Sequence, residues 1–262
     1  MSPLHRRTLD QLTIDDEAAV SGIEAYKLLK RAVQRAGLCF LVPDGTARAV
    51  SWDRALFLNL TFWNASESAD VLCDEHIPAD VVAHVGWHHV ASREIARVVG
   101  GGAGGAAGLF FAESIASAFD LYLVGRLLSV APDCDFIATQ LPIIAEAADV
   151  AGLPADGFAA LMEDVARRPE QSFEDLRALL LDAVTALLPC PGPLEALAAL
   201  ERFGGHRFEP LLHHFQLSNW ILYARAYAVA SPAGDQAVRQ MDLTLRQAPD
   251  ALAWLIDRWL MA

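Results

Sequence analysis

The sequence predicts a mainly α fold: a single multi-helix domain spanning residues 1–262, with a small β element near the N-terminus. Hydrophobic residues make up 54% of the chain, and alanine, a strong helix former, contributes much of that share. Apolar runs with helical spacing recur along the chain, separated by breaks rich in glycine and proline, such as Gly100–Gly105 and Cys190–Pro193. We therefore expect about eight to ten helices around one core.

The N-terminal third is expected to combine one helix with a small hairpin. Residues 13–37 have the pattern of a capped amphipathic helix, in which Thr13 caps the start and Gly37 follows the basic end. Two short β-like runs flank Pro43-Asp44-Gly45, a turn signal, and predict a hairpin. Residues 55–63 are mostly apolar, so periodicity leaves a strand and a buried helix both open.

Two apolar helices are predicted in the middle of the chain. Pro78 has the position of a first-turn proline, and it opens a helix that ends near Val99. Gly100–Gly105 formally match a GxGxxG pattern, but the residues before them have helical spacing, which predicts an interhelical connection and not a nucleotide loop. A second apolar helix follows over residues 106–128. Later helices are predicted over residues 141–152, from Ser172 onward, and over 194–205, 209–230, 234–247 and 249–261.

Composition and charge argue against several classes of partner. The net charge of −13 would repel a phosphate backbone and the basic clusters are small, so no nucleic acid partner is expected. No CxxC pair occurs among the four cysteines, which favours buried thiols over a thiolate zinc site. The N-terminus lacks the apolar core of a signal peptide, so a cytoplasmic location is expected. The uncharged run between Arg97 and Glu113, about fifteen residues, is shorter than the ~20 that span a bilayer, so no membrane span is expected.

Residues 80–95, DVVAHVGWHHVASREI, place three histidines in an otherwise apolar helix. The i, i+4 spacing of His84 and His88 sets both rings on one helical face, where they could share a metal ion. His89 points about 100° away and is expected to be a hydrogen-bonded neighbour. The alternative interpretation is a pair of core histidines satisfied by hydrogen bonds, because this spacing also occurs by chance.

The following helix could supply further ligands. Glu113 and Asp120 are seven residues apart and therefore share a helical face, two turns from each other. Burying a carboxylate in an apolar helix costs free energy unless the carboxylate is paired or binds a metal. We therefore expect His84, His88 and Glu113 to be metal ligands, with Asp120 as a fourth ligand or a group that supports the ligands.

This region resembles the gluzincin metallopeptidases, to which thermolysin belongs. His84-Val85-Gly86-Trp87-His88 matches both histidines of the family's His-Glu-x-x-His motif, and Glu113 follows at a separation typical of its glutamate ligand. Residues 112–119, AESIASAF, are similar to the family's Asn-Glu-x-x-Ser-Asp region, with Ala112 replacing the asparagine and Ser117 the aspartate. The resemblance covers about 35 residues and implies one zinc ion and metal-assisted hydrolysis.

The resemblance departs from the family at the catalytic base, because Val85 replaces the glutamate beside the first histidine. A zinc-bound water would still be acidified. Glu75 or Asp120 would then have to accept its proton, or the metal would serve other chemistry. Two histidines and one carboxylate also match the ligands of non-haem iron oxidoreductases, and His89, Asp120 or Glu75 could help to hold a second ion. Zinc is the first choice of metal and iron the second.

A third hypothesis is a non-catalytic helical interaction or scaffold protein, in which these polar residues satisfy one another. A homodimer formed through an apolar helix face would fit that hypothesis. For either enzyme hypothesis the sequence indicates only a small-molecule or peptide substrate. The His213-His214 pair, on a late helix, is assigned a core or surface role by default.

Overall fold

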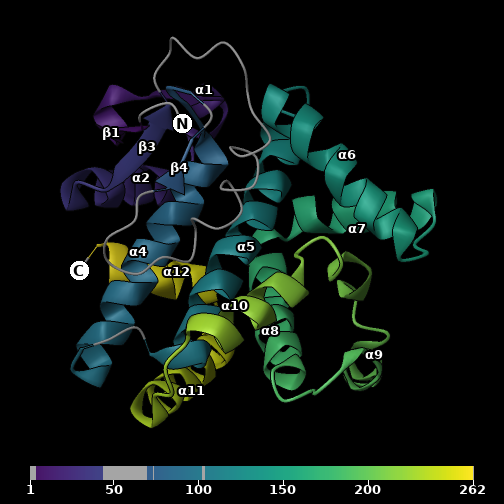
Figure 1. Cartoon of the computed structure of the whole chain (residues 1–262). Helices are drawn as coiled ribbons and strands as arrows, with labels where there is room; N and C mark the ends of the chain where they lie inside the picture. The colour runs from purple at the N-terminus through teal and green to yellow at the C-terminus, as the bar shows by residue number, and fades with distance from the viewer. Residues whose placement is uncertain (1–3, 44–69, 73, 102–103, 262) are drawn as a thin grey trace. The chain divides into compact units, whose positions relative to one another are not determined.

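The computed structural model describes residues 4–43, 70–72, 74–101 and 104–261 (Figure 1). Helices dominate these residues, and the strands among them are short and lie near the N-terminus. This confirms the predicted mainly α fold with a small N-terminal β element. The chain divides into two compact units, residues 1–89 (unit 1) and residues 90–262 (unit 2), and the division falls inside helix α4. The single domain over residues 1–262 stays a prediction.

Unit 1 contains two small sheets. β1 (Leu4–Thr8) pairs antiparallel with β3 (Cys39–Pro43), and β3 pairs in parallel with β4 (Asp70–Val71). β2 (Thr13–Asp15) pairs in parallel with β5 (His76–Pro78). Since β5 leads directly into helix α4, the β2–β5 pair fixes where that helix begins.

The helix predicted over residues 13–37 is wrong at its start. Thr13 was expected to cap that helix, but it lies in β2, where its N–H donates to the carbonyl of Glu75 at 2.9 Å. Capping signals are local, whereas pairing with a strand sixty residues away is a tertiary interaction. Such an interaction readily outweighs a preference worth a fraction of a kcal/mol per residue.

Two helices occupy the rest of that segment. α1 spans Glu17–Val20 and α2 spans Glu24–Ala36, with Gly22 in the turn between them. Glycine is a poor helix former, which favours a break at this position. Gly37 ends α2 in the left-handed conformation, with φ of 61°, which confirms the predicted stop.

Two predictions fall partly or wholly on residues 44–69, which lie outside the described residues. One is the hairpin centred on Pro43-Asp44-Gly45, and the other is the strand or buried helix over residues 55–63. Within the described part of the chain, β3 ends at Pro43 and has β1 and β4 as its neighbours.

Helix α4 (Ala79–Val99) carries the three histidines. Pro78 directly precedes it as the last residue of β5, so the helix begins one residue later than a first-turn proline predicts. Its predicted end at Val99 is confirmed. Gly100 and Gly101 follow with φ of 75° and 119°, a region that favours glycine.

Unit 2 is built from helices. In sequence order they are α5 (Gly105–Val130), α6 (Asp135–Val150), α7 (Ala155–Arg167), α8 (Pro169–Leu187), α9 (Pro193–Leu200), α10 (Leu217–Tyr227), α11 (Pro232–Gln247) and α12 (Ala251–Leu255). Short 3-10 turns cover Glu201–Phe203 and Glu209–Leu211, and a π-helical turn covers Ile256–Leu260.

Three predicted helix starts in unit 2 are wrong. The helix predicted over residues 141–152 begins earlier, at Asp135, as α6. The helix predicted over residues 209–230 is divided into a 3-10 turn and α10, because Gln216 adopts the left-handed conformation with φ of 49°. Ser172, expected to begin a helix, lies fully buried inside α8. That helix begins at Pro169, whose fixed φ suits a first turn and which has no N–H to leave unpaired.

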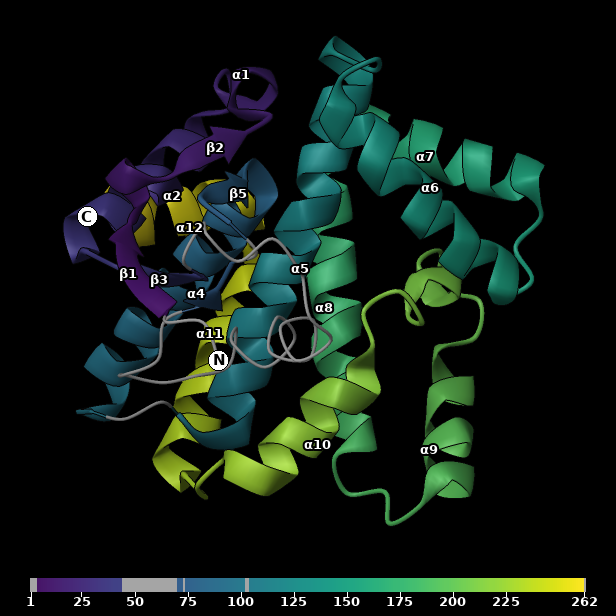
Figure 2. The same cartoon turned by 45° about the horizontal axis from the view of Figure 1, so that its top comes forward.

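Helix α5 is the central helix of unit 2 and confirms the second predicted apolar helix. It packs against α8 along its length and also against α6, α7, α10 and α11; Figure 1 and Figure 2 both show α5 and α8 side by side. A helix that is apolar on all sides is expected to be enclosed in this way. By length and composition α5 could also cross a membrane, but 83% of its most apolar window is buried inside the protein.

A buried arginine on α8 forms an ion pair with α11. The Arg177 side chain is 0% exposed, and its guanidinium donates to Glu174 at 2.6 Å and to Asp242 at 2.8 Å. It also lies 5.7 Å from the centroid of the Phe111 ring on α5. An arginine buried this deeply is tolerated because both carboxylates neutralise it.

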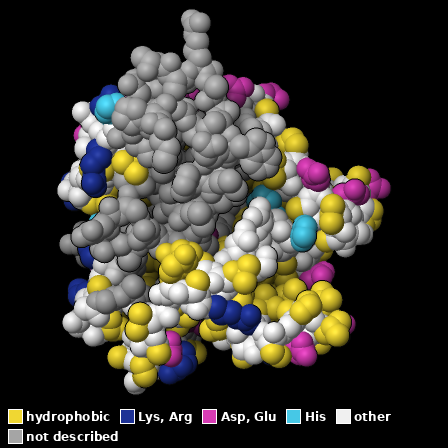
Figure 3. All heavy atoms as spheres, in the orientation of Figure 1, with side chains coloured by type: hydrophobic (Ala, Val, Ile, Leu, Met, Phe, Trp, Pro, Cys, Tyr) yellow, Lys and Arg dark blue, Asp and Glu magenta, His cyan; other side chains and the backbone are white. Residues whose placement is uncertain are grey.

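Helix α9 differs from the other helices of unit 2, because none of its residues is buried. Leu194 is 77% exposed and Leu197 is 61% exposed. Figure 3 shows hydrophobic side chains gathered over the part of the surface that α9 forms. This apolar surface is the feature of the fold most relevant to the interaction-protein hypothesis.

Candidate metal centre

Helix α4 presents two imidazoles one turn apart. His84 and His88 are half-buried, and their ring centroids lie 4.9 Å apart with the rings tilted by 45°. Val85 and Trp87, on other faces of the same helix, are buried. The helix therefore buries apolar side chains on either side of the histidine pair, as the sequence spacing requires.

Glu113 is the acidic member of the site. It lies in the first half of α5 and is 6% exposed, between Ala112 and Ser114, which are also buried. Ser114 donates to the carbonyl of Phe111 at 2.8 Å, within its own helix. An ionised carboxylate at this depth requires compensation from hydrogen bonds or a cation.

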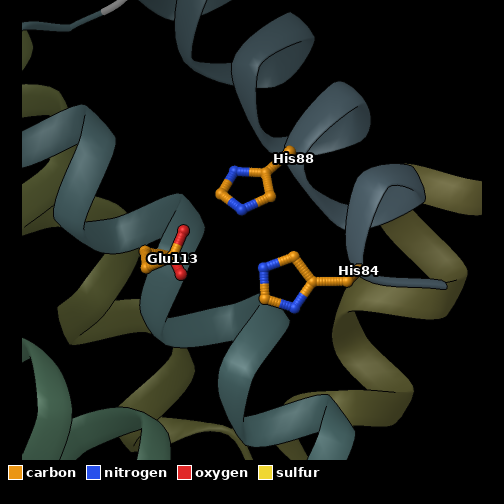
Figure 4. Close-up of side chains that lie close together, drawn as sticks. All are labelled: His84, His88 and Glu113. Carbon is orange, nitrogen blue, oxygen red and sulfur yellow. The ribbon is translucent and has the colours of Figure 1, made fainter. Parts of the chain in front are cut away.

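The structure brings His84, His88 and Glu113 together. Each residue offers one ligand atom, and these atoms all lie within 4.8 Å of one another. Figure 4 shows the two imidazoles and the carboxylate facing one another. Atoms bound to one zinc ion lie ~3.3 Å apart when each is ~2.1 Å from the metal. Small side-chain rotations would bring the three atoms onto one ion. Among the described residues, His84, His88 and Glu113 form the group of ligand-type side chains that could hold a metal ion.

Glu75, a predicted catalytic base, lies outside this group. Its side chain is 61% exposed and forms an ion pair with Arg7 at 3.1 Å, in the loop before β5. The backbone carbonyl of Glu75 accepts a hydrogen bond from Thr13. The observed contacts of Glu75 are therefore with the N-terminal strands, and its role as a base stays a prediction.

Asp120, the other predicted catalytic residue, also lies outside the group of three. It is half-buried on α5, and the structure brings it near His214, which precedes α10. Burial lowers the pKa of His214 below its ordinary value, and the negative charge of Asp120 acts in the opposite direction. The role of Asp120 at the metal stays a prediction.

Asp80 is a residue of this region that the sequence reasoning missed. It lies in the first turn of α4, four residues before His84, and one oxygen of its carboxylate, Oδ1, is buried. An acidic residue in a first turn is commonplace, because it interacts favourably with the helix dipole. The signal that could have found it is the spacing of Asp80, His84 and His88 at i, i+4 and i+8.

Tyr26 is a buried phenol of unit 1. Tyr26 belongs to α2, is 1% exposed and donates to Glu17 at 3.3 Å; Lys30 also donates to Glu17. Burial raises the pKa of Tyr26 far above its ordinary value, and the negative charges of Glu17 and Asp80 raise it further. Tyr26 therefore stays protonated, so that its O–H can donate to Glu17.

A close contact fixes α2 against α4 in this region. A Cβ atom added to Gly86, between the two histidines, would lie 3.0 Å from Cβ of Leu29 and 3.4 Å from its carbonyl oxygen. Leu29 is fully buried. The glycine thus allows the backbone of α4 to approach α2 at Leu29.

No protein-family model matches the chain, and no curated protein or solved structure is significantly similar to it. The resemblance of residues 84–119 to the gluzincins therefore stays a prediction.

Proposed function

We propose that the protein binds one transition-metal ion through His84, His88 and Glu113. The observation that carries this proposal is the convergence of the three ligand atoms to within 4.8 Å of one another. Two neutral imidazoles and one carboxylate are ligands that zinc accepts, and they also suit iron. Zinc is the first choice of metal, and iron is the second.

Metal-assisted hydrolysis is the reaction class that we propose for this site. Three protein ligands leave a fourth position for water or substrate, which distinguishes catalytic zinc sites from structural ones. When bound there, zinc supplies a water molecule acidified to a pKa near neutrality. The substrate would be a small molecule or a peptide. The resemblance of residues 84–119 to the gluzincins supports the same class.

This site would differ from a peptidase active site in its proton acceptor. Val85 stands at the position of the peptidase glutamate and is 8% exposed, with a side chain that cannot take a proton. We propose Asp120 or Glu75 as the proton acceptor. Either carboxylate would accept the proton through a water molecule or after the substrate has moved. The contacts described above favour Asp120, because Glu75 already pairs with Arg7.

A metal measurement tests the proposal directly. Protein purified without a histidine tag should retain about one equivalent of zinc or iron per chain, as expected for a three-ligand site. Three single variants, His84→Ala, His88→Ala and Glu113→Gln, should each lose most of it while their circular dichroism stays helical. His213→Ala is the matched control, because His213 is exposed.

The identity of the retained ion separates the two enzyme hypotheses. Zinc would support hydrolysis, whereas iron that undergoes reversible oxidation would support a non-haem iron oxidoreductase with the same ligands. Wild-type protein that takes up neither ion after incubation with both would overturn the proposal.

The second candidate is a non-catalytic interaction protein, and helix α9 is the observation that favours it. An apolar helix with none of its residues buried is typical of a surface that meets a partner. The partner proposed is a second copy of the chain, meeting it through Leu194 and Leu197. Analytical ultracentrifugation of wild type and Leu197→Glu tests this. A wild-type dimer that the substitution dissociates would support the candidate, and a wild-type monomer at high concentration would reject it. Leu243→Glu is the control, because Leu243 is exposed on α11.

A further inference from the structure

We infer that Asp80 is a positioning residue for the metal centre, whose carboxylate accepts a hydrogen bond from the ring nitrogen of His84 that faces away from the metal. The inference rests on the proposed function, because it assigns a role to Asp80 at the same centre. It adds a fourth side chain to the three ligands, and that side chain acts on the metal only through His84.

The register of α4 places Asp80 on the same side of the helix as His84. Successive residues of an α-helix are rotated by about 100°, so residues four apart are displaced by only about 40° around the helix axis. Asp80, His84 and His88 therefore form one stripe with His84 in the middle. Neighbours at i, i+4 are close enough for their side chains to interact.

The orientation of the His84 ring also supports the contact with Asp80. Figure 4 shows one ring nitrogen of His84 facing His88 and Glu113, while the second nitrogen points away from both. A histidine that binds a metal through one nitrogen almost always donates the N–H of the other, most often to a carboxylate or a backbone carbonyl. Asp80 is the carboxylate one turn away on the same stripe.

The environment of Asp80 also favours a specific role for its carboxylate. Its Oδ1 atom is buried, although a carboxylate whose only purpose is to interact with the helix dipole can stay in solvent. Its negative charge also contributes to the raised pKa of the buried Tyr26 phenol, after burial and Glu17. The packing of α2 against α4 at Gly86 and Leu29 keeps this environment fixed.

The proposed contact would have two consequences for the metal. The hydrogen bond would select one tautomer of His84, so the metal-facing nitrogen would always be the unprotonated one. The negative charge would also make that nitrogen a better electron donor, which strengthens the bond to the ion. Loss of such a partner typically weakens metal binding about 10–100-fold.

A matched pair of variants separates this role from a general helix-dipole role. Asp80 and Asp156 are each the second residue of a helix, α4 and α7 respectively, so both substitutions remove the same interaction with the helix N-terminus. Asp156 is exposed and serves as the control. Asp80→Asn keeps an acceptor oxygen without the charge and is nearly isosteric, whereas Asp80→Ala removes both.

The experiment has two readouts, each made on the full chain. In the metal-free protein, side-chain ¹⁵N shifts should show a single neutral tautomer of His84 in wild type and Asp156→Asn, and a mixture in Asp80→Ala. The His84 signals would be identified by their loss in His84→Gln. In competitive titrations with zinc, affinity should fall about 10–100-fold in Asp80→Ala, fall less in Asp80→Asn, and stay unchanged in Asp156→Asn.

The two readouts distinguish failure of this inference from failure of the proposed function. If wild type binds neither zinc nor iron, the proposed function fails, but the tautomer of His84 still tests its contact with Asp80. If wild type binds zinc and Asp80→Ala matches Asp156→Asn in both affinity and tautomer, the metal centre stands and the role of Asp80 is rejected. Circular dichroism of each variant shows whether it is folded, and the near-isosteric Asp80→Asn keeps the test decisive if Asp80→Ala does not fold.

Discussion

Gly234 and Gly104 meet backbone to backbone. A Cβ atom added to Gly234, in the first turn of α11, would lie 2.5 Å from the carbonyl oxygen of Gly104 and 2.6 Å from its Cα. Gly104 has φ of 73°, a conformation that favours glycine. At this position the glycine-rich connection is a packing element that lets α11 begin against the start of α5, in agreement with its assignment as an interhelical connection.

Substitution of Gly234 by alanine should therefore destabilise unit 2. The added methyl group would overlap backbone atoms, which cannot move aside as a side chain can, and overpacking of this kind costs about 1–3 kcal/mol. Urea unfolding measures the change in the free energy of unfolding. Gly22→Ala is the control, because a Cβ there would meet nothing within 4 Å. Equal stability of Gly234→Ala and Gly22→Ala would contradict the close approach.

Val85 leads to a prediction about substrate range. Because Val85 replaces the peptidase glutamate that follows the first histidine, zinc-loaded protein should not cleave an unfolded substrate such as casein. The measurement is release of peptides over several hours, with His88→Ala as the metal-deficient comparison. Cleavage by wild type that His88→Ala abolishes would show that another residue accepts the proton. Asp120→Asn and Glu75→Gln would then identify which one.

His214 leads to a prediction about pH. Burial lowers its pKa in the folded protein, so the unfolded chain binds a proton more readily as the pH falls below about 6.5. His214 therefore favours unfolding on acidification, and its contribution to stability is fully present above about pH 6.5. His214→Gln should reduce the loss of the free energy of unfolding between about pH 6.5 and 5. Chemical denaturation at a series of pH values measures this slope.

His76 provides the opposite case for comparison. A hydrogen bond from its ring to Asp15, at 2.8 Å, raises the pKa of His76. Its contribution to stability is therefore present at acidic pH and is lost as the pH rises through its folded pKa. His76→Gln should make the protein lose more stability on acidification, whereas His214→Gln should make it lose less. Slopes equal to that of wild type in both variants would contradict both assignments.

Arg177 should be far more sensitive to substitution than an exposed arginine. Arg177→Ala would leave Glu174 and Asp242 facing each other without their shared cation, a loss that typically costs about 3–5 kcal/mol. Arg167 pairs with Glu163 at 3.1 Å on the surface of α7, and Arg167→Ala should cost less than about 1 kcal/mol. Thermal and urea unfolding of the two variants measure the difference. A cost for Arg177→Ala below 1 kcal/mol would show that the ion pairs of Arg177 contribute little to the packing of α8 with α11.

The grouping of His84, His88 and Glu113 was predictable from sequence because each residue carries a local signal. His84 and His88 are one helical turn apart, and Glu113 is a carboxylate in an otherwise apolar helix, where burial would be costly without a partner. Asp80 was not predictable in the same way. A first-turn aspartate already has an ordinary explanation in the helix dipole, and only its burial and its effect on Tyr26 distinguish it.

The boundaries of elements were harder to predict than their existence. The long helices α4 and α5 follow directly from apolar length and from the glycines that separate them. Thr13 was misassigned because a strand distant in sequence pairs with it, and no local pattern reports such a partner. The break before α10 depends on the left-handed backbone of Gln216, a residue that carries no sequence signal for that conformation.

The enclosure of α5 links the proposed metal centre to the lifetime of the protein. An ion that binds only the folded chain adds RT ln(1 + [L]/Kd) to the free energy of unfolding, about 2.7 kcal/mol at a hundred times the dissociation constant. Glu113 lies in the helix around which unit 2 is assembled. A cell short of metal would therefore hold a less stable form of the protein, open to faster proteolysis, and the amount of protein would follow the supply of the ion.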